Sequence, residues 1–167
     1  MSTRSGHGET VQAHLLELPV PLAARAQEHF QELLREFTLI STDSTDSTDS
    51  TDSGPQVPAR LLELVDVLTR QFGGLNTDAE DRLEEAIAQG RRVIHDHVLE
   101  LPPEAGPAAQ ALGAMIDEAE EYCRKGQHLL TLAAPPDLVA YRHWYLEQVV
   151  SQLEGQPPVP WPEYART

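Results

Sequence analysis

The sequence predicts an all-α protein: a single-domain bundle of about five helices with one extended crossover and a proline-rich C-terminal tail. Five segments carry apolar residues at helical spacing, and four of them end at a glycine. The composition is 40% hydrophobic but only 5% aromatic, which favours a core of Leu, Val and Ala over a sandwich of strands. A chain of 167 residues is long enough for one domain and too short to predict two.

We expect a disordered N-terminal tail over residues 1–10, a helical bundle domain over 11–155 and the proline-rich tail over 156–167. The first helix follows Pro19 and Pro21, which suit the approach to a helix and its first turn. Its apolar residues fall on one side, so it is amphipathic: Leu22, Ala26, Phe30, Leu33 and Phe37.

The second helix begins near Pro58 and ends at Gly73. Its apolar residues surround most of its circumference, so we expect it to be the most enclosed helix. The third helix has the capping-box pattern Thr77 to Glu80 and ends at Gly90. Its apolar face is narrow, which predicts a position at the edge of the bundle.

Residues 93–103, VIHDHVLELPP, form the stretch that we expect to be extended. A fourth helix follows and ends at Gly126, and a fifth begins with prolines and ends at Gly155. The tail over 156–167 holds four prolines, so we expect polyproline II there and no helix.

Four Ser-Thr-Asp triplets occupy residues 41–52, within a loop that we expect to be disordered over 41–55. In polyproline II the aspartates would lie about 9 Å apart, too far to close around one calcium ion. Generic phosphorylation remains an alternative. Because loop entropy grows slowly with length, a tolerated surface insertion is the favoured interpretation.

The formal net charge of −15 argues against nucleic acid or an anionic membrane as the partner and allows a basic protein. The N-terminus lacks the apolar segment of a signal peptide, and no stretch is apolar enough to span a bilayer. The one cysteine, Cys123, cannot form an internal disulfide. We therefore expect a soluble protein of the reducing cytoplasm.

No pattern of catalytic or cofactor-binding residues emerges, so we expect no enzyme and no cofactor. His95 and His97 could face one side of an extended chain, but no third zinc ligand is supplied by a motif. A di-iron site needs Glu three residues before His, and none of the seven histidines has one. Cys123 lies in an apolar stripe near a helix C-terminus, where a thiolate is disfavoured.

The fifth helix carries two anomalies. Arg142 lies at the centre of the apolar side, which predicts a structural buried charge paired with a carboxylate or an arginine that reaches out to solvent. Trp144 points almost the opposite way, so either the proline-rich tail covers it or it anchors an interface.

The fourth helix places three acidic residues opposite its apolar stripe: Asp117, Glu118 and Glu121. Acidic residues on an outer face are usually only solvated. The functional alternative is an interaction surface made of this strip together with Trp144 and Trp161 of the tail.

The segments LPVPLAARAQEHFQELLREFTLI, VPARLLELVDVLTRQFGG and EEYCRKGQHLLTLAAPPDLVAYRHWYLEQVVSQLEGQPPVPWP together resemble small acidic helical proteins of high-GC actinobacteria. Such proteins occur beside anti-sigma-factor kinases, STAS-domain antagonists and PP2C-type phosphatases. The resemblance omits the first ten residues and the triplet repeat. It implies a regulatory, protein-binding role in partner switching or stress response, and it assigns no catalytic residue.

The leading hypothesis is therefore a non-enzymatic protein-interaction module with a basic partner protein, in an anti-sigma-factor or stress-response pathway. One alternative is a small-molecule sensor that holds an apolar ligand in the bundle near Arg142. The other is an acidic DNA mimic that inhibits a protein by occupying its basic groove.

Overall fold

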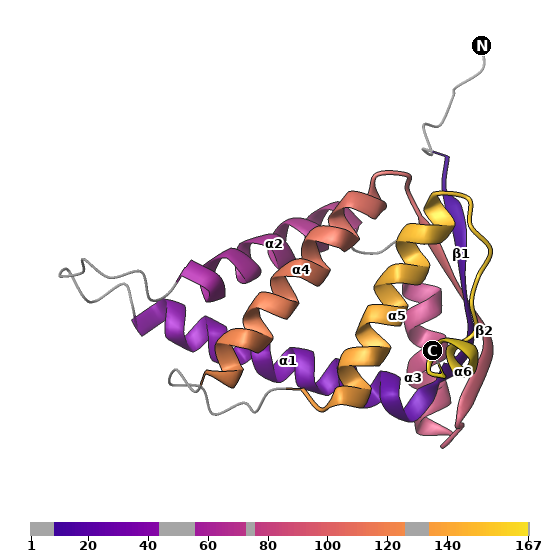
Figure 1. Ribbon diagram of the computed structural model, residues 1–167, viewed down its shortest axis with the longest axis horizontal. Coiled ribbons are helices and arrows are strands. Elements are labelled where there is room, and N and C mark those ends of the chain that lie inside the picture. Colours follow the sequence, from indigo (N-terminus) through magenta and orange to yellow (C-terminus); the bar gives the residue numbers. More distant parts are fainter. Residues whose placement is uncertain (1–8, 44–55, 73–75, 126–133, 167) are drawn as a thin grey trace, which may run out of the picture.

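The computed structural model describes residues 9–43, 56–72, 76–125 and 134–166 of the chain. Within these ranges it contains six helices and a two-stranded antiparallel sheet (Figure 1). The all-α prediction was therefore wrong: the fold is mixed α/β, although most of it is helical. The sheet lies at one end of the molecule, and the helix pair α2 and α4 lies toward the other.

The sheet pairs β1 (Val11–Pro19) with β2 (Val93–Leu101), from Val11 opposite Leu101 to Pro19 opposite Val93. The extended stretch predicted over 93–103 is confirmed as β2. The strand β1 was missed, because residues 11–19 were included in the helical bundle. Its inward residues Ala13 and Leu15 are fully buried and alternate with more exposed neighbours, which is the period of a half-buried strand.

Side chains from two helices cover the outer edges of this sheet. The amide of Gln152 on α5 (Pro136–Leu153) accepts from the His14 N–H at 2.8 Å and donates to the His14 carbonyl at 2.9 Å. Asn76 does the same for Glu100 on β2, at 2.8 and 3.2 Å. A two-stranded sheet has two exposed edges, so these amides satisfy backbone groups that could otherwise pair with another chain.

Asn76 also explains a departure from the predicted capping box. The helix α3 (Thr77–Ala88) has Asn76 at its N-cap, and the Asn76 side chain makes no capping hydrogen bond. The Asn76 side chain is bonded to β2 instead. The predicted end near Gly90 fits the structure, where Gly90 has a φ of +67° directly after the helix.

The long helix α1 (Val20–Asp43) connects two hydrophobic clusters. Its first turns pack against the sheet, α3 and α5, around residues such as Leu15, Leu18 and Trp144. Its later turns pack against α2 (Gln56–Phe72) and α4 (Ala105–Arg124). The buried members of this second cluster are Leu33, Phe37, Leu61, Ile116 and Ala119.

The most enclosed helix is α5 and not the second helix, contrary to prediction. It lies between the sheet and α4 (Figure 1), packs against both, and has six buried residues. On α2, Leu61 is fully buried, but Val67 is 41% exposed. The apolar residues around the circumference of α2 therefore led to an overestimate of its burial. A helix that packs on one side leaves some of its apolar residues exposed to water.

The C-terminal tail contains a short helix, α6 (Trp161–Tyr164), so the prediction of a tail without helix was wrong. Pro160 is at its N-cap and Pro162 is in its first turn, where the missing N–H costs nothing.

The triplet repeat begins inside a helix, because Ser41–Asp43 belong to α1. The remaining triplets, residues 44–53, lie outside the described residues, as do residues 1–8 of the predicted N-terminal tail.

His97 on β2 is buried, with 4% of its surface exposed, whereas the side chain of His95 is 85% exposed. The two imidazoles therefore do not face one site. The strand opposite is distorted at Glu17, which has a φ of +55° and contacts His95 at 2.9 Å. Among the described residues, the buried Nδ1 of His97 has no hydrogen-bond partner.

Burial lowers the pKa of His97 from 6.5, and the charge of Arg82 acts in the same direction while Asp96 opposes it. Below pH 6.5 His97 therefore binds a proton in the unfolded chain but stays neutral in the native protein. The free energy of unfolding falls as the pH drops below 6.5. We expect His97→Gln to flatten the loss of unfolding free energy between pH 7 and pH 5, measured by urea unfolding. The contribution of one proton is at most about 1.4 kcal/mol per pH unit.

His95→Gln on the same strand is the exposed control and is expected to keep the wild-type loss. If the loss of unfolding free energy between pH 7 and pH 5 is the same in His97→Gln as in the wild type, His97 is not its cause.

Candidate functional site

The helices α4 and α5 run antiparallel and approach closely on one side. A Cβ atom on Gly113 would lie 3.1 Å from a methyl carbon of Leu146, and one on Gly106 would lie 3.6 Å from Leu153. Gly113 therefore allows the two helices to come together at this level, because a side chain there would have to displace Leu146. This close contact fixes the relative position of the residues on the outer surface of the pair.

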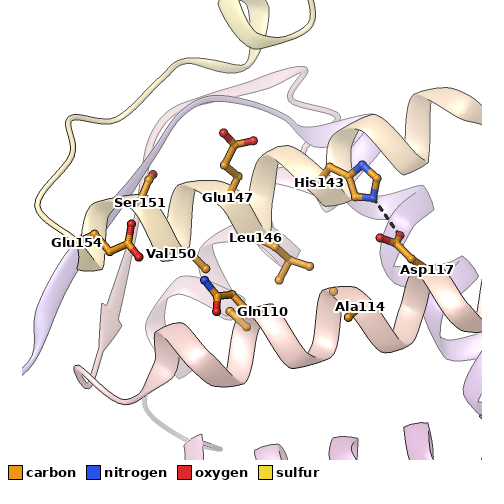
Figure 2. A pocket seen from close by; sticks show the side chains of 11 residues that line it. Gln110, Ala114, Asp117, His143, Leu146, Glu147, Val150, Ser151 and Glu154 are labelled. Carbon is orange, nitrogen blue, oxygen red and sulfur yellow. Dashed lines mark hydrogen bonds and ion pairs between the residues drawn. The ribbon is translucent and has the colours of Figure 1, made fainter.

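An open groove of about 550 Å³ follows this helix pair (Figure 2). Its apolar lining consists of small residues from α4 and larger ones from α5: Ala109, Gly113, Ala114, Leu146 and Val150. In Figure 2, Leu146 and Val150 point toward α4, while Gln110 and Ala114 face them. The polar residues that surround this lining are Gln110, Asp117, His143, Glu147, Ser151 and Glu154.

The α5 side of the groove carries negative charge without a basic partner. Glu147 points away from α4 in Figure 2 and accepts a hydrogen bond from the neutral Tyr164 hydroxyl. Glu154 is exposed at the far end. Neither forms an ion pair with a basic side chain in the ranges that the structure describes.

At its other end the groove is bounded by a network of charged side chains around Arg142. The guanidinium of Arg142 contacts Asp117 at 2.7 Å and Glu120 at 3.4 Å. Glu120 also contacts His29 of α1 at 2.9 Å and accepts from the Ala134 N–H at 2.7 Å. His143 contacts Asp117 at 2.9 Å, which Figure 2 shows as a dashed line.

Arg142 thus lies where the sequence predicted a structural buried charge, with a side chain that is 14% exposed. Its two carboxylate partners come from α4, and one of them also binds α1, so the network joins three helices. Its Nε atom is buried and has no partner among the described residues.

The chemistry of this network favours a structural role. Burial alone would raise the pKa of Glu120, but hydrogen bonds from His29 and Ala134 and the charge of Arg142 outweigh it and lower the pKa. For Asp117, burial is likewise outweighed by His143 and Arg142. A carboxylate with a lowered pKa is a weak base and a poor proton donor near neutral pH. Within the described residues, no group of three metal-ligating side chains could hold an ion.

The predicted acidic strip is exposed but largely paired within the chain. Glu118 lies 3.5 Å from Arg60 of α2, and Glu121 pairs with Arg124 and with Lys125. Asp117 is held by Arg142 and His143. These local cations reduce the field that the strip presents, whereas Glu147 and Glu154 form no ion pair with a basic side chain of the described residues.

Trp144 does not belong to an interaction surface. It is fully buried, and its Nε1–H donates to the Val159 carbonyl at 2.8 Å. Trp161 packs edge-on against it, with ring centroids 5.6 Å apart. The tail therefore covers Trp144, as one of the two sequence alternatives stated, and Trp161 itself is only partly exposed.

The sequence interpretation missed the groove. Its signal was present as small residues spaced along α4, at Ala109, Gly113 and Ala114, which leave room on a helix surface. The assumption that α5 buries only one face hid the role of its other sides. The prediction that Cys123 lies in a buried stripe concerns a side chain outside the described residues.

Comparisons with known proteins found no matching family model, no similar curated protein and no similar solved structure. In the described part of the chain, no helix is both long enough and apolar enough to cross a bilayer.

Proposed function

We propose that the protein is a non-enzymatic regulatory module of the cytoplasm that binds a basic segment of a partner protein in the α4–α5 groove. The observation that carries this proposal is the pairing of an apolar groove with Glu147 and Glu154, which have no basic partner in the described chain. Apolar contact supplies affinity, and unpaired charge steers association and selects the partner.

The surroundings of the groove support binding over chemistry. Two of the ionisable groups that line the groove, Asp117 and His143, are already bonded to each other. Arg142 is neutralised by two carboxylates, so it offers no free cation to a small acidic ligand. Exposed acids also occur on α1, α2 and α3 and are not gathered in one row, which favours a protein-binding role over mimicry of DNA.

The resemblance to small acidic actinobacterial proteins supports a setting in partner switching or stress response. A partner of that kind would be an anti-sigma-factor kinase, its antagonist or a phosphatase. The charge of −15 on the whole chain disfavours nucleic acid as the partner.

We expect charge reversal of both groove acids, E147K with E154K, to abolish capture of the physiological partner. The variant that matches it in charge is E28K with E32K on α1, where both residues are exposed. Each version would be used to capture proteins from cells that make this protein, and quantitative mass spectrometry would compare them.

The partner is a protein retained by the wild type and by the α1 variant but lost by the groove variant. Its purified form is then expected to bind the groove variant at least about tenfold more weakly, the equivalent of about 1.4 kcal/mol. Equal losses in both variants would mean that only total charge matters and would contradict the groove. Circular dichroism and a thermal midpoint check that Glu147→Lys leaves the fold intact.

A further inference from the structure

We infer that the occupant of the α4–α5 groove is an amphipathic α-helix of the partner, with two basic residues seven positions apart beside its apolar stripe. This inference rests on the proposed function and names the partner's secondary structure and its charge pattern.

The first reason is the supply of hydrogen bonds. The groove is lined by side chains of two helices, whose backbone groups are bonded within each helix. An extended peptide would find no row of free N–H and C=O groups here, as it would at the edge of a sheet. The edge groups at His14 and Glu100 are already covered by Gln152 and Asn76. A helix satisfies its own backbone, so it fits this surface without unpaired polar groups.

The second reason is shape. The lining residues of α5 and its C-cap extend from His143 to Glu154, twelve residues that span about 16 Å along the helix axis. A partner helix of about three turns matches this length. The α4 side offers Ala109, Gly113 and Ala114, and small residues allow helices to approach to about 8–10 Å.

The third reason is the position of charge. Glu147 on α5 and Glu154 at its C-cap are seven positions apart, which places them on one side of the helix about 10 Å from each other. Two basic residues one heptad apart on the partner helix have the same spacing. The opposite side of the groove is neutral at Gln110, and Asp117 is held by Arg142 and His143. The basic residues are therefore expected on one flank only.

The test uses three synthetic peptides of about 16 residues, each with a fluorescent label. The first is an amphipathic helix with an Ala and Leu stripe and two Lys seven positions apart on one flank. The second has the same composition but a central proline, which prevents the helix. The third replaces both Lys with Glu. Anisotropy titrations measure the dissociation constant of each peptide at low and moderate salt.

We expect the first peptide to bind and the other two to bind at least about tenfold more weakly. Binding of the first peptide should weaken about tenfold in E147K with E154K and remain unchanged in E28K with E32K. Ala114→Trp, which fills the groove at an exposed position, should abolish binding. Ala111→Trp, at an exposed position of α4 outside the groove, should not.

The outcomes separate the inference from the proposed function. If the proline peptide binds as well as the helical peptide, and both depend on Glu147 and Glu154, the helix is excluded while a basic groove ligand stands. If no peptide binds at concentrations near 1 mM, roughly the weak limit of useful affinity, the inference is overturned, and capture of the cellular partner still decides the proposed function. If Ala111→Trp and Ala114→Trp weaken binding equally, the groove is not the site and both are overturned.

Discussion

Replacement of Arg142 by alanine is expected to lower the free energy of unfolding by about 3 kcal/mol or more. The reason is the carboxylate that it leaves behind. The side chain of Glu120 is only 4% exposed, and the change removes the guanidinium of Arg142 that contacts it. Glu120 would keep His29 and the Ala134 N–H, and Asp117 would keep His143. Urea unfolding at neutral pH measures the loss.

Arg60→Ala is the matched control, because it also removes an arginine that pairs with a carboxylate of α4. Arg60 lies 3.5 Å from Glu118, but the two side chains are 54% and 46% exposed. Exposed pairs contribute about 0–1 kcal/mol, so this variant is expected to remain close to the wild type. A similar small effect for Arg142→Ala would mean that solvent reaches Glu120 and that the network adds little to stability.

The Arg142 variant should also change its response to acid. The pKa of Glu120 is lowered in the folded protein, so its contribution to stability is present above the unfolded value of 4.5 and is lost as the pH falls through the folded value. Without Arg142 that pKa rises, and the acid transition of the variant is expected to begin at a higher pH.

The sequence predicted the kinds of residue that meet at Arg142, but it did not predict which carboxylates and which histidine would contact it or its partners. An arginine at the centre of an apolar helix side predicts either a path for the side chain to solvent or a carboxylate partner. Which acid supplies it depends on how α4 and α5 cross, and the glycines at 106 and 113 set that crossing through their contacts with Leu153 and Leu146. His29 of α1 contacts Glu120 although the two residues are ninety-one positions apart in the chain. A local sequence pattern does not predict such a contact.

The sheet shows the opposite case, where a local signal existed and was misjudged. The strand β2 was predicted as an extended stretch, rich in valine, isoleucine and leucine, that ends at two prolines. The strand β1 has its own signal, apolar residues at every second position (Val11, Ala13 and Leu15), but it continues directly into α1 at Val20. No glycine separates the two elements, and the helical period of the longer segment dominated the interpretation. The pairing with β2 then decides the local structure, since each strand alone buries too little.

The burial of Trp144 was predicted only as one of two alternatives, for a related reason. A helix packed on one side should place a large aromatic residue on that side, and Trp144 lies away from the side that Leu138 and Val149 define. The structure encloses α5 between α4 and the sheet and then covers Trp144 with the tail. Gln148 takes part by accepting from the Val159 N–H at 2.7 Å. No pattern in the sequence around Gln148 predicts that this side chain binds the backbone of the tail at Val159.

Trp144→Ala is expected to cost about 3–5 kcal/mol of unfolding free energy, the range for removal of a large aromatic side chain from a core. Trp144 is fully buried, and its ring contacts both Tyr141, at a centroid distance of 5.8 Å, and Trp161 of the tail. Trp144→Phe keeps most of this packing but leaves the Val159 carbonyl without its donor, so a smaller loss of about 1–2 kcal/mol is expected. Hydrogen exchange at the Val159 amide reports whether the tail remains in place, and it should be fast only in Trp144→Ala.

Trp161→Ala is the control variant, at the partly exposed ring of the same pair. It should lower the free energy of unfolding by less than Trp144→Ala does. Equal losses at the two tryptophans would mean that the tail, and not the packing of α5, accounts for the stability of this end of the molecule.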